Sequence, residues 1–432
     1  MGILRHPDFR RLWAADLLSQ LGSRLSMGAI PLLAVLTLDA STLQVSLLRT
    51  CETAAWLVLG LFAGAWADRV RCRPVLVYAD LLRALLFASI PIAWWFDVLT
   101  LTQVYVVLVP AGILTVLFDV AHTSYLPRLL ERERLLPGNA KLAANHSMAA
   151  VLGAGASGLL VQWLGAALTI GLDALSFLWS AVWLRAIRAT EVAPVQPERP
   201  NLRREIGEGL RFVFRHPLLR PLALNTMTTM LFQAAAGAIM VVYLVRGVHL
   251  QPATIGVLSM IGLLGAIVAS AVTEKLSSRY GDARTLLVSS TGIGVAFTVQ
   301  ALTGPGWQVS WFVVGTLLAG FCIIVSYVLQ VSTQQRLCPA ALQGRVSATM
   351  SFVSWGATPL GSLLGGALGT AFGLQLTLWI AGLGTLAGTA ALYLSPLRRL
   401  RTIPAEEVPT PRPSQSSGDA VVQRGGEPDG RL

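Results

Sequence analysis

Long apolar runs separated by short basic loops dominate this sequence. Of its 432 residues, 54% are hydrophobic and only 13% are charged, and the mean hydropathy is +0.63. A soluble domain carries roughly 25% charged residues. Because a helix needs about 20 apolar residues to cross a bilayer, the chain has room for about a dozen spans. We therefore predict a protein that crosses the membrane many times.

Twelve segments have the length and apolar character of a membrane span. They cover residues 11–37, 43–66, 74–96, 103–126, 142–163, 166–186, 222–245, 252–274, 285–303, 308–333, 346–370 and 375–394. In lipid the backbone must satisfy its own hydrogen bonds, so we predict helices rather than strands. Between the sixth and seventh spans, residues 202–214 have the apolar periodicity of an amphipathic helix lying on the inner leaflet.

The basic residues fall in alternate loops. All but four of the 33 lysines and arginines lie at the N-terminus, in the loops after every second span, or in the C-terminal tail. The four exceptions are Arg24, Arg49, Arg83 and Arg246. Arginine excess marks the cytoplasmic face, so both termini are predicted to be cytoplasmic in a protein of the inner (plasma) membrane. The net charge of +11 is spread over these loops, which argues against a nucleic-acid partner.

The chain contains an internal repeat. Arg5-His6-Pro7 and its surroundings recur at residues 215–222, and Gly153 and Gly158 recur as Gly361 and Gly366, at a nearly constant offset. We predict a domain plan of four parts. These are an N-terminal six-helix half over 1–186, a cytoplasmic linker with the amphipathic helix over 187–221, a C-terminal six-helix half over 222–396 and a disordered cytoplasmic tail over 397–432.

The loop after the second span carries a motif. Gly64 is followed at the fourth position by Asp68 and then by Arg69, and Arg71 and Arg73 come next. This pattern resembles the loop between helices 2 and 3 of the major facilitator superfamily, in which the continuation is x-G-R-[RK]. Here the glycine and one arginine are replaced, and Arg73 keeps its place.

The resemblance covers about residues 5–396, and within the superfamily it is nearest to the branch of bacterial multidrug, macrolide and siderophore efflux proteins. The stretches that carry it are Phe9–Trp13, Ala79–Ala84, Leu126–Leu129, Asp173–Phe177 and Gly344–Val346. It implies an all-α membrane fold in which twelve transmembrane helices form two pseudo-symmetric halves that insert in the same direction.

Charged residues inside the predicted spans are concentrated in the first half. They are Asp16, Arg24, Arg49, Glu52, Asp80, Arg83, Asp119, His122 and Asp173, whereas the second half has Glu274 at the edge of a span. Charges in a bilayer are costly and are functional candidates by default. Three pairs have the i,i+3 spacing of one helical face: Arg49/Glu52, Asp80/Arg83 and Asp119/His122. Each pair either neutralises itself to hold the fold or serves transport, and the third pair is the stronger candidate for transport because it contains a histidine, a residue type that often relays protons.

The resemblance implies that spans 1, 4, 7 and 10 line a central cavity. It therefore places Asp16, Arg24, Asp119 and His122 near the coupling and substrate pathway. Arg24 has no local partner, so it would meet a carboxylate on another span or an anionic substrate. In the second half Asn225, Gln233, Tyr327 and Gln330 are candidates for substrate contacts, with hydrogen bonds between helices as the alternative.

The resemblance also implies a cytoplasmic latch. Gly60 and Gly64 on span 2 would allow close approach to span 11, where Gly361, Gly365 and Gly369 have the same spacing. Asp68 would then lie beside the amino end of span 11, near residues 344–347, where the helix dipole stabilises a carboxylate. Arg69 and Arg73 would pair with nearby acids, and the contact would break when the cytoplasmic side opens.

These features predict a secondary transporter that exports a small amphipathic molecule by alternating access, coupled to protons. The expected partners are the small-molecule substrate, protons and the lipid bilayer, and the protein is expected to act as a monomer without metal or cofactor. An importer or a lysophospholipid flippase on the same fold is the alternative. An integral-membrane enzyme is disfavoured, because the histidines assemble no nucleophile–base or metal cluster. No G-x-x-x-x-G-K-[ST] loop for nucleotide binding occurs.

Overall fold

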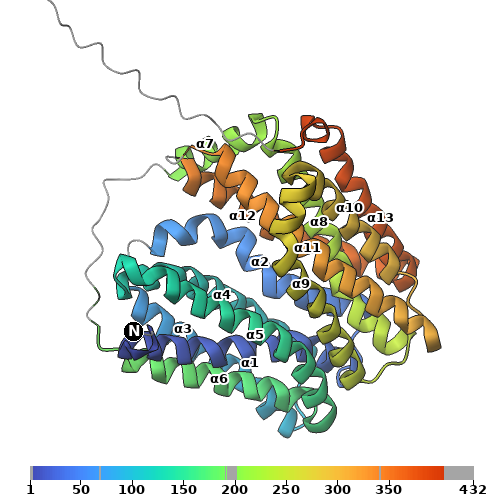
Figure 1. Ribbon diagram of the computed structural model, residues 1–432. Helices are drawn as coiled ribbons and strands as arrows, with labels where there is room; N and C mark the ends of the chain where they lie inside the picture. The colour runs from blue at the N-terminus through green and yellow to red at the C-terminus, as the bar shows by residue number, and fades with distance from the viewer. Residues whose placement is uncertain (1–2, 68–69, 190, 192–201, 340–341, 403–432) are drawn as a thin grey trace, which may run out of the picture.

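The structure is a computed structural model that describes residues 3–67, 70–189, 191, 202–339 and 342–402; of residues 61–67, 132 and 202–206 it describes the backbone only. The described residues form helices and no strands (Figure 1). The six helices of the first half are α1 (Pro7–Leu36), α2 (Thr42–Ala67), α3 (Cys72–Trp95), α4 (Leu101–Leu129), α5 (Arg132–Leu164) and α6 (Ala166–Ala186). The later helices are α7 (Leu202–Arg215), α8 (Leu219–Val242), α9 (Pro252–Tyr280), α10 (Asp282–Gln300), α11 (Val309–Leu337), α12 (Gln343–Phe372) and α13 (Leu374–Tyr393).

Three short 3-10 turns and one π-helical turn accompany them: η1 (Ile3–Arg5), η3 (Gly306–Gln308), η5 (Pro396–Arg399) and the π turn η2 (Tyr243–Gly247), which extends α8. Among the described residues, 8 helices are long and apolar enough to cross a membrane, as judged by length and composition: α3, α4, α5, α6, α8, α9, α11 and α13. The other predicted spans are α1, α2, α10 and α12, helices of 30, 26, 19 and 30 residues. The predicted all-helical fold class is confirmed.

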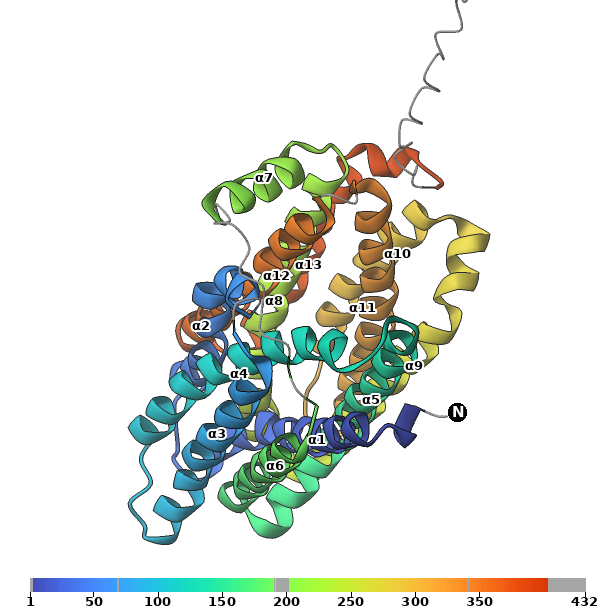
Figure 2. The same ribbon diagram turned by 90° about the vertical axis from the view of Figure 1, so that its left-hand side faces the viewer.

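The packing of the helices repeats from one half to the other. In the first half α1 packs on α5 and α6, α3 packs on α4 and α6, and α2 packs on α4. In the second half α8 packs on α12 and α13, α10 packs on α11 and α13, and α9 packs on α11. Each pairing in one set has its counterpart in the other, so two similar bundles lie side by side (Figures 1 and 2).

The two bundles meet mainly along α2 against α12 and α5 against α9. We call the end of the molecule at which α1 begins the basic end, and the end at which α1 leads into α2 the far end. Contacts between the bundles are dense near the far end. A Cβ on Gly366 would lie 2.5 Å from the Ser46 Cβ, and one on Gly158 would lie 2.2 Å from the Pro252 carbonyl oxygen. Only glycine fits this close approach of α5 to α9.

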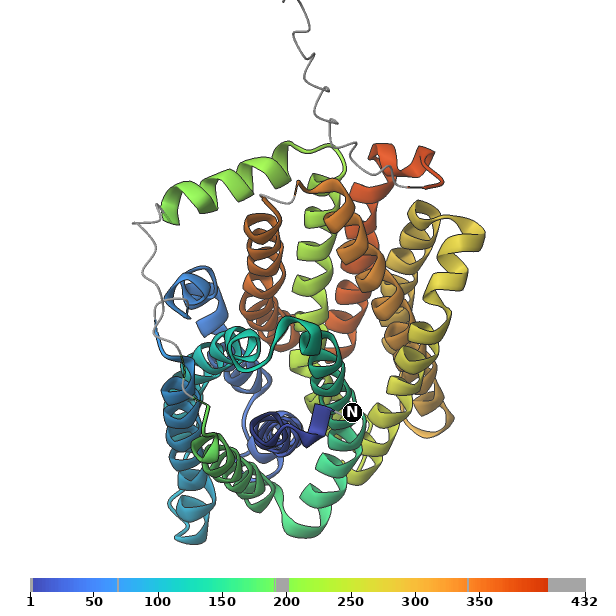
Figure 3. The same ribbon diagram turned by 60° about the vertical axis from the view of Figure 1, so that its left-hand side comes forward.

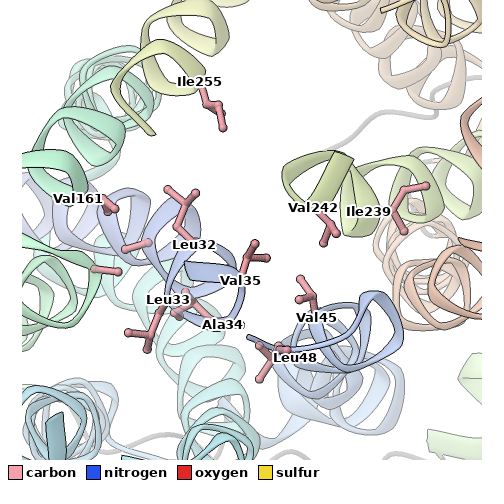
Figure 4. Close-up of a cluster of buried hydrophobic side chains, with 14 of the residues drawn as sticks. Leu32, Leu33, Ala34, Val35, Val45, Leu48, Val161, Ile239, Val242 and Ile255 are labelled. Atoms are coloured by element: carbon pink, nitrogen blue, oxygen red, sulfur yellow. The ribbon is translucent and has the colours of Figure 1, made fainter. Parts of the chain in front are cut away.

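An apolar cluster fills the space between the bundles near the far end. Its buried side chains come from both halves, including Val35 of α1, Val45 of α2, Val242 of α8 and Ile255 of α9. Figure 4 shows Val35, Val45 and Val242 directed into one space between three helices. Arg246 and Asp39 add an ion pair of 2.7 Å across the halves beyond this cluster. The far end is therefore closed by packing and by charge.

Toward the basic end the contact between α2 and α12 becomes sparse. Trp56 and Trp355 stack there with ring centroids 5.7 Å apart. Beyond this stack, a Cβ on Gly60 would meet, among the described side chains, Trp56 of its own helix, and one on Gly344 would meet no described atom within 4 Å. The prediction that Gly60 serves close packing against span 11 is therefore wrong. Gly361 and Gly365 instead face α8 at Leu231 and Ala235, because α12 presents those glycines to its own bundle.

The amphipathic segment is helix α7, which lies over the start of α12 at the basic end (Figure 3). Val213 is fully buried in a cluster that includes Leu219 and Val346. Glu208 of α7 also forms an ion pair with Arg345 of α12. Part of the apolar face of α7 therefore packs on the second bundle.

Candidate functional site

Four buried or half-buried acids gather inside the first bundle, each from a different helix. They are Asp16 of α1, Asp80 of α3, Asp119 of α4 and Asp173 of α6, and we call them the acidic cluster. Arg83 and His122 lie within electrostatic range of Asp119, as do Asp16 and Asp80. The first bundle thus concentrates titratable groups from α1, α3 and α4 in one region. Such groups are costly in a bilayer and mark pathways for ions or substrates.

Asp80 and Arg83 form the innermost pair of this region. Their side chains join through a direct ion pair, and 0% and 4% of them are exposed. The Arg83 guanidinium also lies over the rings of Phe118 and Phe177, at 4.3 and 4.4 Å from their centroids. A cation held between two aromatic faces and one carboxylate is compensated without water. The pair therefore holds α3 against α4 and α6 through the contacts of Arg83 with the two rings.

The acid that lies nearest to the His122 ring belongs to another helix. Its Nε2 lies 3.7 Å from Asp16 Oδ1, and no hydrogen bond or ion pair joins the described atoms of His122 to Asp119. Asn145 of α5 donates to Asp16 Oδ2 at 2.9 Å, which fixes the carboxylate between α4 and α5. The predicted Asp119/His122 pair is therefore corrected to Asp16/His122. Helical spacing puts residues on one face, but the rotamer decides which helix the side chain meets.

Asp119 and Asp173 occupy different surroundings. Asp119 is half-buried and makes no hydrogen bond with the described residues. Asp173 is 1% exposed, accepts a hydrogen bond of 3.1 Å from the Ser176 hydroxyl, and packs against Gly22 of α1. A Cβ on Gly22 would lie 2.6 Å from the Asp173 carboxylate, so the glycine makes room for it.

Arg24 meets a histidine that the sequence did not single out. Its Nη2 lies 2.9 Å from Nε2 of His146 on α5. Because an arginine can only donate, the imidazole Nε2 accepts, and the ring must be neutral with its proton on Nδ1. The approach depends on Gly153, since a Cβ there would lie 2.4 Å from the Arg24 Cβ. No local spacing connects residues 24 and 146, so the sequence alone gave no indication of this contact.

Arg49 and Glu52 of α2 form the third charged pair. Their contact is 2.7 Å, and 31% and 37% of their side chains are exposed. Arg49 lies within electrostatic range of Arg24. Glu52 precedes Trp56 by one helical turn on the same face of α2. This accessible pair therefore lies near the aromatic stack at which α2 and α12 begin to separate.

The candidate contacts of the second half take different roles in the structure. Gln330 accepts from the Thr226 hydroxyl at 2.8 Å and donates to Ser326 at 3.0 Å, so it joins α8 to α11. Tyr327 is 63% exposed on α11. Asn225 is buried, and its amide makes no hydrogen bond with the described residues. Gln233 is half-buried on α8.

The motif of the loop after α2 is described in part. Asp68 and Arg69 lie outside the described residues, and of Gly64 only the backbone is described. Arg73 donates from its side chain to the carbonyl oxygens of Leu184 and Arg185 at the end of α6, at 3.3 and 2.6 Å. Arg73 therefore ties α3 to α6, where the sequence predicted an acidic partner.

Solved transporters share this architecture. The nucleoside transporter NupG superposes with a TM-score of 0.76 at 10% identity, over 89% of this chain and 99% of that chain. A bacterial homologue of the iron transporter ferroportin, in an inward-facing state, gives a TM-score of 0.72 at 16% identity, over 91% and 99%. Together with the duplicated bundles, these likenesses show that the chain has the major facilitator fold.

Relatives in sequence narrow the class further. The multidrug efflux pump Tap of Mycolicibacterium fortuitum is 31% identical over 420 residues, which is 92% of this chain and 97% of that protein. Tap of Mycobacterium tuberculosis (strain H37Rv) is 28% identical over 427 residues, or 94% and 98% of the two chains. The model of the family described as transmembrane secretion effector matches residues 1–423. The chain belongs to this family of the major facilitator superfamily, which confirms the resemblance found in the sequence.

Proposed function

We propose that this protein exports small amphipathic compounds, including drugs, by proton-coupled alternating access. It would act as a monomer in the inner (plasma) membrane with both termini in the cytoplasm. The assignment of drug export draws on the relatives named multidrug efflux pumps, which match nearly the whole chain. The orientation draws on the arginine-rich loops of the basic end, which becomes the cytoplasmic end.

One observation carries the proposal of alternating access. Close contacts between the bundles lie near the far end, whereas among the described residues a Cβ on Gly60 or on Gly344, toward the basic end, would meet no atom of the opposite bundle within 4 Å. A two-bundle transporter with this asymmetry is closed to the outside and accessible from the cytoplasm. Export then requires the opposite arrangement, in which the apolar cluster of the far end separates and the basic ends meet.

We assign proton coupling to the acidic cluster, and first to Asp16 with His122. The two titratable side chains are 3.7 Å apart and come from α1 and α4. Asp119 stands within electrostatic range of both. A proton taken up here changes the attraction between two helices, and this is the kind of local change that biases a two-state bundle. On the first bundle, two pairs would face the substrate: Arg24 with His146, and Arg49 with Glu52. On the second bundle, Tyr327 and Gln233 would face it from the opposite side. Gln330 would hold that wall in place through its hydrogen bonds to α8 and α11, and the buried Asn225 amide would contact the substrate.

We also assign the cytoplasmic latch to Gly64, Asp68 and Arg69, on the strength of the motif. In the closed state Asp68 would approach the amino end of α12, where a Cβ on Gly344 meets nothing within 4 Å. Arg73 would take no part in this contact, because its side chain already holds the end of α6.

The proposal is tested by export from a pump-deficient bacterial host. Cells loaded with a fluorescent amphipathic drug should lose it when the protein is produced, and a protonophore should abolish that loss. Asp16→Asn should reduce export to the level of the empty vector. Asp97→Asn is the matched control, since Asp97 lies in the α3–α4 loop with φ of 55°, a conformation that asparagine tolerates.

Two outcomes would redirect the assignment. Export that continues at full rate in the Asp16→Asn variant would remove Asp16 from coupling. Gradient-driven accumulation of the compound inside the cells would favour an importer, and export of labelled lysophospholipid alone would favour a flippase.

A further inference from the structure

A basic cavity opens at the basic end of the first bundle, away from the acidic cluster. It has a volume of about 550 Å³ and lies between the first turns of α3 and the residues that follow α6. Its lining includes four arginines: Arg71, Arg73, Arg185 and Arg188. Neither the acidic cluster nor the contacts between the bundles use it.

The charges of this cavity are unbalanced. Glu191 is the acid in its lining, and that carboxylate already accepts from the Arg128 side chain at 2.8 Å and from the backbone amides of Cys72 and Arg73. Arg71, Arg185 and Arg188 are exposed, and their side chains form no ion pair with a described acid. Three guanidinium groups therefore line one cavity without a described acid to pair with them, and the cavity suits an anion. The planar fork of arginine suits the oxygens of a phosphate.

The remaining lining is apolar and leads along the lipid-facing surface. Pro74, Val77 and Leu81 form the floor, and Tyr78 is 66% exposed at its rim. From Tyr78, the residues Leu82, Leu85 and Ser89 continue along one face of α3 at helical spacing. The last three line a second, apolar hollow of about 450 Å³, together with Ile113 and Leu114 of α4. The stripe from Tyr78 to Ser89 is about 16 Å long at 1.5 Å per residue.

We propose that this surface binds an anionic phospholipid from the leaflet at the basic end. The headgroup phosphate occupies the cavity on Arg71, Arg185 and Arg188, and one acyl chain lies along Leu82 and Leu85. Basic pockets between membrane helices take such headgroups, and tyrosine belongs at headgroup level. A free anion would need the arginines alone, whereas the apolar stripe that starts at the cavity rim fits a lipid. The inference requires a membrane beside the basic end and does not depend on what the protein transports.

The test compares lipid binding to the purified full-length protein. Phosphatidylglycerol is added to protein in neutral detergent, and the bound lipid is counted by native mass spectrometry. Phosphatidylcholine and inorganic phosphate serve as separate probes. Substituting R71Q, R185Q and R188Q together should weaken phosphatidylglycerol binding by about 100-fold, at about fivefold for each arginine near the lipid headgroup.

The matched control removes three arginines of the basic end outside the cavity, as R220Q, R398Q and R399Q. This control loses the same net charge as the triple variant, and it should bind phosphatidylglycerol like the unaltered protein because its arginines lie outside the cavity. Leu85→Trp fills the apolar hollow without changing charge, and it should weaken lipid binding even if the triple variant fails to fold. Any of three results would overturn the proposal. The control variant could lose as much phosphatidylglycerol binding as the triple variant, or Leu85→Trp could bind the lipid fully. Inorganic phosphate at millimolar concentration could also displace the lipid.

Discussion

The ion pairs Asp80/Arg83 and Arg49/Glu52 have the same i,i+3 spacing and opposite burial, so they provide a controlled test of the electrostatic reasoning. The first pair is 0% and 4% exposed, and the second is 31% and 37% exposed. Removing one partner of a buried pair leaves an uncompensated charge, at a cost of about 3–5 kcal/mol. An accessible pair contributes about 0.2–1 kcal/mol.

A double-mutant cycle of Asp80→Asn and Arg83→Gln should therefore give a coupling free energy of about 3 kcal/mol, well above the ~0.5 kcal/mol scatter of independent sites. The buried cation also loses its two aromatic contacts in Arg83→Gln, at about 2 kcal/mol or more each when desolvated. That loss appears equally in the single variant and in the double variant, so it cancels from the coupling.

The free energies of unfolding are measured in bicelles by steric trapping, with Arg49→Gln and Glu52→Gln as the second cycle. The accessible pair should couple by less than about 1 kcal/mol. Equal coupling energies in the two cycles would refute the assignment of Asp80/Arg83 as a buried structural lock.

Other predictions concern the contacts between helices. Gly158→Leu should abolish export and lower thermal stability, because its Cβ alone would lie 2.2 Å from the Pro252 carbonyl oxygen. Gly237→Leu, at a position where a Cβ would meet no described atom within 4 Å, should leave the thermal unfolding temperature unchanged. His146→Ala should impair export because it removes the acceptor that Arg24 uses at 2.9 Å. His146→Gln should restore part of the export rate through its amide oxygen, and a failure of rescue would assign the histidine another role.

Hydropathy and charge were sufficient to predict the fold because each membrane span must satisfy the requirements of the bilayer on its own. Each segment must be long, apolar and helical whatever its neighbours are. The glycine repeat was harder to interpret, since spacing identifies a smooth helix face without identifying the helix that packs on it. Gly361 and Gly365 accordingly face α8, whereas Gly366 faces α2.

The site was predicted where its contacts are local. Asp80/Arg83 and Arg49/Glu52 are neighbours on one helix, and the structure pairs them as the spacing predicts. Two other contacts join residues more than 100 positions apart: His122 with Asp16, and Arg24 with His146. Helical periodicity relates only residues of one helix, so it could not predict these contacts. Glu191, which holds the start of α3, was missed because no local pattern connects it to Cys72.

Cross-linking of the far end tests the central claim most directly. The Asp39 Oδ1 and Arg246 Nη2 atoms lie 2.7 Å apart across the two bundles. Both residues are replaced by cysteines in a background without the native cysteines, and the two thiols are joined by a bis-methanethiosulfonate reagent that spans the length of the lost arginine side chain. Export is then measured in vesicles before cross-linking, after it, and after reduction. The account predicts that cross-linked protein stops exporting, because the far end must open in every cycle, and that reduction restores the rate. Undiminished export by fully cross-linked protein would contradict alternating access by separation of these two bundles.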